Sequence, residues 1–206
     1  MTSLRLYTTL LQDPRTSEDK RKKIPYDISR LLDRMEWLIE TLLKLSKLDS
    51  GTVHFRQDTV SVEQLIRQAA QLVEIPMELR GQELSIRLEG DETYTGDLSW
   101  SVEAVSNILK NCMEHMETGG SIEIAASETP IYTEITIRDH GLGIDQNDAE
   151  HLFERFYRGH NATSSSIGIG LALARMIIKE QNGTIRVENV KDGGALFTIR
   201  FYREVV

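Results

Sequence analysis

The apolar residues of this chain change their spacing abruptly at Asp49-Ser50-Gly51, and this change limits the folds available to it. Before that point they recur every three or four residues, as on one face of a long helix. The recurring positions are Ile28, Leu31, Leu32, Met35, Leu38, Ile39, Leu42 and Leu45. After it, short strand-like runs alternate with shorter helical patterns. We therefore expect two domains, residues 1–50 and 51–206.

The first domain is expected to be a helical hairpin. A short helix from Thr2 to Leu11 stops at Asp13-Pro14, and Thr16-Ser17-Glu18 caps a long helix from Glu18 to Leu48. The spacing of the long helix suggests a hairpin that dimerises into a bundle. The short helix cannot cover the long one, which favours a partner or a missing piece. The alternative is an amphipathic helix that folds onto its own domain.

The second domain is expected to be α+β, a two-layer α/β sandwich in which helices cover one face of a mixed sheet. The expected strands are residues 52–60, 84–88, 93–95, 121–126, 131–139, 185–190 and 195–201. The expected helices are residues 62–73, 97–116, 149–156 and 168–181, with a loop at 160–166. Asp97 is the predicted cap of the second helix, and Asn182-Gly183 closes the last one.

Composition excludes several classes of partner. The formal charge is −8 and no basic run is interleaved with aromatic residues, so nucleic acid is not an expected partner. The single cysteine, Cys112, cannot form an internal disulfide and suits a reducing cytosol. No apolar run reaches the roughly 20 residues that span a bilayer, and no signal peptide opens the chain. We expect a cytoplasmic chain that contacts a membrane only through segments outside this sequence.

The helix that begins at Asp97 carries a polar row with a spacing of four residues. Glu103, Asn107, Asn111 and His115 lie on one face. Asparagine is unfavourable inside helices, so two on one face indicate a use. An amide oxygen is a suitable Mg²⁺ ligand beside phosphate oxygens. Taken alone, the row also fits a solvated face, and His115 also fits a cation at a helix C-terminus.

A carboxylate ends the strand that precedes Gly141. Asp139 shares the parity of Ile135 and Ile137, so it points to the apolar side of that strand. A buried carboxylate needs hydrogen-bond donors, and the exocyclic amine of adenine with a bound water could supply them. Gly141 and Gly143 allow a tight turn and a close approach to a planar ring. The alternative is an ordinary Asp-Gly turn at a strand end.

A glycine-rich helix start follows a serine-rich loop. Gly168, Gly170 and the residues around them, up to Ala172, present backbone N–H groups that favour phosphates. The preceding loop is interpreted as a lid over a nucleotide, and Arg158 as a positive charge within reach of a phosphate. The pattern lacks the strand that a Rossmann or P-loop site requires. Two further predictions are structural: Phe153 and Phe156 anchor the base of the lid, and His54, His151 and His160 are surface residues.

Together these motifs resemble sensor histidine kinases of two-component systems. The N, G1, F, G2 and final glycine boxes of that family correspond to Asn107–Asn111, Asp139–Gly143, Phe153–Phe156, Gly168–Leu171 and Gly194–Phe197. Residues 31–51 resemble the second helix of its dimerisation and phosphotransfer domain. Five boxes in the family's order make coincidence very unlikely as an explanation.

The resemblance implies the Bergerat ATP-binding fold with ATP and Mg²⁺ as cofactors. It makes Asn111 the magnesium ligand, assigns catalysis to Asn111 and Asn107, and makes Asp139 the adenine-binding residue. The remaining residues implied around the nucleotide are Asn107, Lys110, His115, Gly141, Gly143, Arg158, Gly168, Ile169, Gly170 and Leu171. Related ATPases such as gyrase and the MutL proteins carry Glu at the position of Asn107. Because an amide cannot accept a proton, Asn107 favours phosphoryl transfer over hydrolysis.

The sequence departs from the family at three places. Ser165-Ser166 stands where a glycine pair is common, with Ile169 where Leu is usual. Residues 112–115 (Cys-Met-Glu-His) replace Ala, a basic residue and an aromatic. Residues 1–7 look like the segment after the phospho-acceptor motif, and none of the five histidines fits the acceptor. We therefore expect a truncated chain that binds ATP without phosphorylating itself.

The expected function is the kinase core of a bacterial two-component sensor histidine kinase. It would transfer the γ-phosphoryl group of ATP to an upstream His and then to an Asp of a response-regulator receiver domain. The parent would be a homodimer through the N-terminal helices, with a cytoplasmic kinase core and an anchor in the bacterial membrane. The alternatives are a nucleotide-binding dimerisation scaffold without kinase activity, and a Bergerat-fold serine kinase or ATPase.

Overall fold

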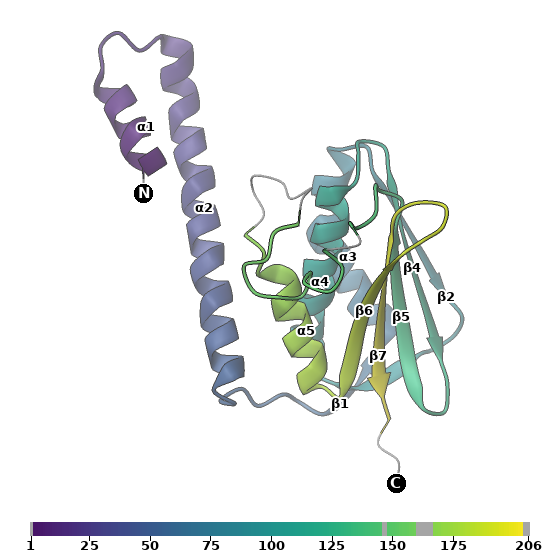
Figure 1. Cartoon of the computed structure of the whole chain (residues 1–206). Helices are drawn as coiled ribbons and strands as arrows, with labels where there is room; N and C mark the ends of the chain where they lie inside the picture. The colour runs from purple at the N-terminus through teal and green to yellow at the C-terminus, as the bar shows by residue number, and fades with distance from the viewer. Residues whose placement is uncertain (1, 146–147, 160–166, 204–206) are drawn as a thin grey trace. The chain divides into compact units, whose positions relative to one another are not determined.

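The structure is a computed structural model of the chain and describes residues 2–145, 148–159 and 167–203 (Figure 1). These residues form two compact units, Met1–Asp49 and Ser50–Val206. The division lies beside the Asp49-Ser50-Gly51 break at which the apolar spacing changes. Within the described ranges, no helix has both the length and the apolar character needed to cross a membrane.

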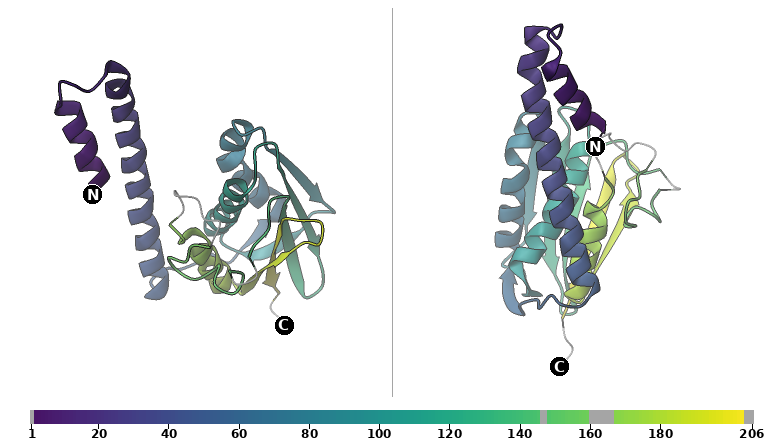
Figure 2. Two further views of the ribbon diagram at one scale, coloured as in Figure 1. Left: turned by 45° about the horizontal axis from the view of Figure 1, so that its top comes forward. Right: turned by 90° about the vertical axis from the view of Figure 1, so that its left-hand side faces the viewer.

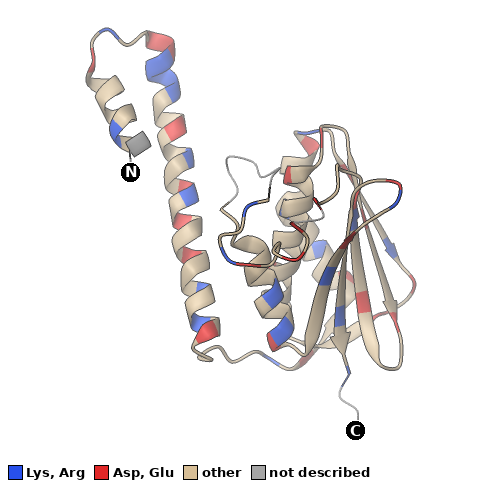
Figure 3. Ribbon diagram, viewed as in Figure 1, with Lys and Arg blue, Asp and Glu red and all other residues tan. Residues whose placement is uncertain are grey.

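The first unit contains two helices, α1 (Thr2–Gln12) and α2 (Glu18–Asp49), as the sequence predicts. Thr16 stabilises the turn between them because its hydroxyl donates to the carbonyl of Leu10 at 2.6 Å. Charges of both signs are interspersed along α2 (Figure 3). Six large apolar side chains of α2 are nevertheless more than a third exposed: Tyr26, Leu32, Met35, Ile39, Leu42 and Leu43. The unit therefore presents an apolar surface along α2.

The second unit is a two-layer α+β sandwich, which confirms the expected fold class. Its five-stranded sheet has the order β2-β4-β5-β7-β6; β2 and β4 are parallel, and the other neighbours are antiparallel. The three helices that the structure describes in this unit cover one face of the sheet, as both views in Figure 2 show. The strands are β1 (Asp58–Ser61), β2 (Glu83–Leu88), β3 (Thr93–Gly96), β4 (Ser121–Glu128), β5 (Tyr132–Asp139), β6 (Gly183–Asn189) and β7 (Ala195–Tyr202). The helices are α3 (Val62–Glu78), α4 (Leu98–His115) and α5 (Gly170–Glu180).

The core lies between the helices and the sheet, and strand parity determines which side chains enter it. In β5, Ile135 and Ile137 are fully buried, whereas the alternate residues Glu134 and Thr136 are only half-buried. Burial of an isoleucine side chain contributes about 1.5–3 kcal/mol, so this alternation fixes the face of the strand. The same parity buries Asp139 at the end of β5.

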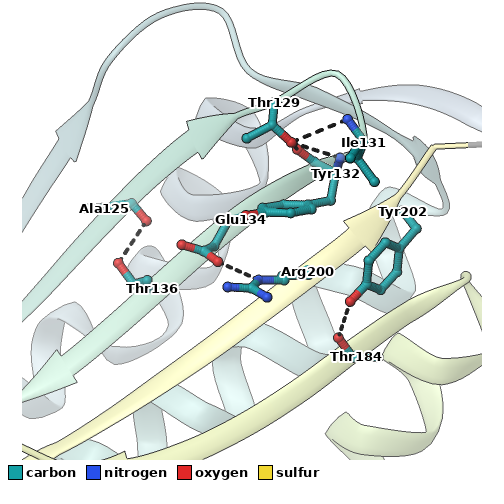
Figure 4. Close-up of polar contacts among 9 residues, drawn as sticks. All are labelled: Ala125, Thr129, Ile131, Tyr132, Glu134, Thr136, Thr184, Arg200 and Tyr202. Carbon is teal, nitrogen blue, oxygen red and sulfur yellow. Dashed lines mark hydrogen bonds and ion pairs between the residues drawn. The ribbon is translucent and has the colours of Figure 1, made fainter.

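The opposite face of the sheet is covered by polar pairs (Figure 4). Arg200 forms an ion pair with Glu134, and its guanidinium carbon lies 4.7 Å from the centre of the Tyr132 ring. The hydroxyls of Thr184 and Tyr202 lie 3.4 Å apart. Pairs of this kind at the surface contribute little stability, so the apolar face carries most of the packing.

The strand expected over residues 52–60 is mostly wrong, because only Asp58–Ser61 is a strand. The residues before it pack on α4 instead. The rings of Phe55 and Trp100 lie 5.4 Å apart, and Arg56 N donates to Asp97 Oδ2 at 3.2 Å. The backbone N–H of Arg56, which in a strand would bond to a neighbouring strand, is therefore bonded to Asp97, the cap of α4.

The helix expected over residues 149–156 is also wrong, because the structure has a series of turns there. The hydrogen bonds span three residues, as from His151 N to Asp148 O and from Glu154 N to His151 O. Phe156 has a φ of +63° and donates from its backbone N to Gly168 O at 2.7 Å. A left-handed residue tied to a distant carbonyl cannot continue an α-helix.

The ends of other elements differ from expectation by a few residues. The last helix, α5, begins at Gly170 and not at Gly168, because the φ of Gly168 is +76°. Helix α3 continues beyond Val73 to Glu78. The lid predicted at residues 160–166, with His160, Ser165 and Ser166, lies outside the described residues.

Candidate functional site

Three elements of the second unit meet around the predicted nucleotide-binding residues: the end of β5, the last turns of α4 and the start of α5. The sequence places α4 here because Asp97 caps it, with Oδ1 accepting from Ser99 N and Trp100 N. A buried stripe that includes Val105, Leu109 and Cys112 then fixes its rotation. Contacts link α4 to both α5 and β5.

Asp139 is 5% exposed and receives two backbone donors. Its Oδ1 accepts from Gly141 N at 3.0 Å and from Ala195 N at 3.2 Å. Donors of this kind stabilise an ionised carboxylate in a buried position. Because both engage Oδ1, the second oxygen is left for a contact from outside the turn.

The turn after Asp139 is closely packed at its glycines. A Cβ on Gly141 would lie 3.1 Å from both Asp139 Oδ1 and His115 O. Gly143 has a φ of +76°, and a Cβ there would lie 2.7 Å from Asn189 Oδ1. The turn therefore needs glycine at both positions, and it is held against the end of α4.

The two asparagines of α4 lie in different surroundings. Asn107 is buried, its Nδ2 donates to Glu103 O at 2.9 Å, and its Oδ1 lies 3.1 Å from where a Cβ on Gly170 would stand. Asn111 is half-buried one turn later. Asn107 thus joins α4 to the start of α5, and Asn111 is the more accessible amide.

Among the residues that the structure describes, none provides a side-chain cap at the start of α5. Ile169 occupies the capping position and is fully buried, and no side chain hydrogen-bonds to the first turn within the described residues. The first backbone N–H groups of a helix lack partners inside the helix and attract anions. Leu171 is buried, so in this turn the backbone, and not this side chain, is the group suited to bind a phosphate.

The other predicted residues lie around these groups with differing exposure. Lys110 and His115 are half-buried on α4, and Arg158 is exposed in the irregular segment that follows the turns at residues 148–156. Phe156 is 58% exposed, so its predicted role as a packing anchor is wrong. Phe153 is half-buried with the Arg175 guanidinium carbon 5.8 Å from its ring centre. The exposed positions of His54 and His151 are as predicted.

Sequence reasoning missed three groups that shape the site. Gly194 has a φ of +82°, and a Cβ there would collide with the Asp139 carbonyl. Asn189 holds the glycine turn, because its Oδ1 accepts from Ile144 N at 2.7 Å and its Nδ2 donates to Ile144 O at 2.6 Å. Cys112 is fully buried on α4, and burial, together with the charge of Asp139, raises the pKa of its thiol. The final glycine box gave a signal for Gly194, whereas the contacts of Asn189 and Cys112 depend on tertiary packing.

Comparison with known proteins gives the same assignment as the motifs. Residues 96–205 match the family model described as histidine kinase-, DNA gyrase B-, and HSP90-like ATPase. The sensor histidine kinase RppB of Synechocystis is 32% identical over 182 residues, which are 85% of this chain and 39% of RppB. This chain spans 40% or less of the length of the first curated relatives that it matches.

Solved structures share the fold at low sequence identity. The histidine kinase AdeS of Acinetobacter baumannii has a TM-score of 0.78 at 19% identity, over 99% of this chain and 95% of AdeS. The histidine kinase ThkA, in complex with the response regulator protein TrrA, has a TM-score of 0.70 at 18% identity, over 98% of this chain and 56% of that one. At these identities the likeness shows the fold alone.

Proposed function

The chain belongs to the histidine kinase-, DNA gyrase B- and HSP90-like ATPase family, as a catalytic domain of the histidine kinase type, and we propose that it is the ATP-binding kinase core of a two-component sensor histidine kinase. The observation that carries the proposal is the cradle of Asp139, a buried carboxylate with two backbone donors on one oxygen. With Oδ1 fixed in this way, the second oxygen of Asp139 is held in place as an acceptor for an amine.

The adenine base would be recognised through Asp139. Its second oxygen accepts the exocyclic amine, and the carbonyl that guanine carries at the same position would be repelled. Gly141 and Gly143 would let the backbone lie close to the plane of the base. A side chain at either position would crowd the atoms that pack around this turn. This arrangement supports selection of adenine.

The phosphates would bind at the uncapped start of α5. The backbone N–H groups from Gly170 onward provide donors without a bulky side chain, and Gly168 provides the left-handed turn before them. Arg158, Lys110 and His115 are the proposed positive or donor groups nearby. Such local groups are needed because the whole chain carries a charge of −8.

Magnesium would be held by Asn111 together with the phosphates. The half-buried amide of Asn111 fits a hard ion of this kind, and the bound ion would neutralise phosphate charge. Asn107 has its Nδ2 committed to Glu103 O. Because no amide can act as a general base, we propose that this site transfers the γ-phosphoryl group to a protein residue and does not hydrolyse ATP.

The helical unit would supply the dimer and the phosphotransfer surface. We propose that residues 1–50 are part of a dimerisation and phosphotransfer domain. The six exposed apolar side chains of α2 named above, here called the exposed row on α2, would face a second copy. The phosphoryl group would pass to a histidine outside these 206 residues and then to an aspartate of a response regulator. The whole protein would carry this core on the cytoplasmic side of a bacterial membrane.

Labelling with γ-phosphate-labelled ATP tests the proposal. The 206-residue chain with Mg²⁺ should bind ATP, release no inorganic phosphate over time and take up no acid-labile label. A chain extended by the acceptor helix should become labelled, and Asn111→Ala should abolish that labelling. Steady phosphate release would indicate an ATPase, and ATP binding without labelling of the extended chain would indicate the scaffold alternative.

A further inference from the structure

The end of the β6–β7 hairpin contacts the proposed adenine cradle at two points. Ala195 opens β7 and donates from its backbone N to Asp139 Oδ1 at 3.2 Å. Asn189 closes β6 and is the register partner of Ala195. The side chain of Asn189 bonds to Ile144, directly after the glycine turn Gly141–Gly143. The hairpin end therefore connects the carboxylate to the turn.

The Asn189 amide pairs with Ile144 as the backbone of a neighbouring strand would. Its Oδ1 accepts from Ile144 N at 2.7 Å, and its Nδ2 donates to Ile144 O at 2.6 Å. A carboxamide carries an acceptor and a donor in one plane, so a single side chain satisfies both backbone groups. An ionised aspartate at this position would have no hydrogen to donate, and an alanine would have neither group. The pairing thus depends on the amide.

The Asn189 amide also lies beside Gly143. Its Oδ1 is 2.7 Å from where a Cβ on Gly143 would stand, and Gly194 O is 3.4 Å from that point. The turn therefore packs directly on the end of the hairpin. Because the Asp139 carboxylate is bonded to the same hairpin end through Ala195 N, the hairpin sets the spacing between the carboxylate and the turn.

We propose that Asn189 is a positioning residue for base recognition: its amide fixes the glycine turn at the distance from Asp139 that a purine ring needs. This inference rests on the proposed function, because it requires Asp139 and the turn to bind adenine. Asn189 acts through Ile144 and does not touch the nucleotide itself. It is exposed at the end of an edge strand, so its replacement leaves the buried core intact.

Calorimetric titration of Asn189→Ala with ATP and with ADP, each with Mg²⁺, tests the proposal. Both dissociation constants should rise by the same factor, about three- to tenfold, the usual worth of a hydrogen bond. The factor should be the same because the substitution acts on the base, whereas the phosphates bind at the start of α5. Asn189→Asp should also raise both constants, since it lacks the donor to Ile144 O. Unchanged affinities in Asn189→Ala would overturn the proposal.

Asn182→Gly is the matched control, from the residue that precedes β6. Asn182 Nδ2 also donates to a backbone carbonyl, that of Tyr202 at 3.2 Å, and its φ of +55° suits glycine. The control removes a comparable hydrogen bond far along the strand from the cradle, so both affinities should equal those of wild type. A loss in Asn182→Gly as large as that in Asn189→Ala would show a general structural effect and overturn the proposal.

A double-mutant cycle keeps this inference separate from the proposed function. Without the Asp139 carboxylate its spacing from the turn loses its importance, so Asn189→Ala should weaken ATP binding less in Asp139→Ala than in wild type. If Asp139→Ala alone leaves ATP affinity unchanged, the adenine site is wrong, and the role of Asn189 with it. If Asp139→Ala weakens ATP binding and the two effects simply add, only the role of Asn189 is wrong.

The amide hydrogen of Ile144 reports the contact directly. Because Asn189 Oδ1 accepts this hydrogen, its exchange with solvent, followed by NMR, should be slower in wild type than in Asn189→Ala. Equal exchange rates in the two proteins would contradict the contact and the proposal.

Discussion

Gly119 and Gly194 have the same backbone φ but differ in how closely neighbouring atoms approach them. Gly119 and Gly194 both have a φ of +82°. Nothing lies within 4 Å of a Cβ on Gly119, whereas a Cβ on Gly194 would collide with the carbonyl of Asp139. The pair therefore distinguishes the cost of a left-handed alanine from the cost of displacing the strand end that carries the carboxylate.

Gly194→Ala should destabilise the protein more than Gly119→Ala. The left-handed conformation alone costs about 1–2 kcal/mol, and the collision adds about 1–3 kcal/mol. Gly194→Ala should also weaken ATP binding, because Ala195 N and the Asp139 backbone would move. Urea unfolding and calorimetry measure both effects. Equal loss of stability in the two variants, with unchanged ATP binding, would show that the backbone adapts at Gly194.

At the scale of elements, the turns between β5 and α5 are held by a phenol and a buried carboxylate. Tyr157 donates to Asp148 Oδ1 at 2.7 Å. This hydrogen bond and the charge of Asp148 raise the pKa of Tyr157 from 10.0 to about 12. The folded protein thus prefers the protonated phenol, and the contact contributes stability only while the phenol keeps its proton.

The contribution of Tyr157 should disappear at high pH. Because its folded pKa is raised, the stabilisation is complete below pH 10.0 and is lost as the pH rises toward about 12. Tyr157→Phe lacks both the hydrogen bond and the titration. The difference in unfolding free energy between wild type and Tyr157→Phe should therefore be larger at about pH 8 than at about pH 11. A difference that is constant across this range, or that grows, would contradict the assignment.

The elements that sequence predicts well are those whose signals are local. Helix α4 is bounded as expected because Asp97 caps it, and the hairpins β4–β5 and β6–β7 follow from alternation and turn residues. The apolar spacing of Leu152, Phe153 and Phe156 also resembles a helix. There, the hydrogen bond from Phe156 N to Gly168 O decides the backbone, and no local pattern reveals it.

The residues of the candidate site also divide into those with a local sequence signal and those placed by contacts between distant elements. Asp139 and its glycines are visible as a strand end and a turn, and strand parity already predicts that the carboxylate is buried. The burial of Cys112 requires α4 to pack on the sheet, and the hydrogen bonds of Asn189 with Ile144 require β6 to reach the turn. Contacts between elements distant in sequence are thus the part that could not be predicted.

At the scale of the molecule, the exposed row on α2 predicts self-association. Ile39 is 55% exposed in the middle of this row. Ile39→Glu should weaken a dimer by at least about 2 kcal/mol, roughly thirtyfold in its dissociation constant, because a buried carboxylate lacks donors. Sedimentation equilibrium measures the change, and ATP affinity should stay the same.

Leu72→Glu provides the matched control for the dimer. Leu72 is 54% exposed on α3, in the other unit, so its substitution introduces the same charge at a similar exposure. It should leave the association unchanged. A dimer that is lost in Leu72→Glu and kept in Ile39→Glu would assign the interface to the second unit.

The most direct test of the account is a calorimetric titration of Asp139→Asn with ATP and Mg²⁺. Because Oδ1 must accept from Gly141 N and Ala195 N, the amide nitrogen of the new residue would take the second position and present a donor to the adenine amine. Loss of a hydrogen bond to a charged group costs about 1.5–3 kcal/mol, so ATP affinity should fall roughly 10- to 150-fold. Glu188→Gln, an exposed change on β6, should bind as wild type. Wild-type affinity in Asp139→Asn would contradict the proposed adenine site.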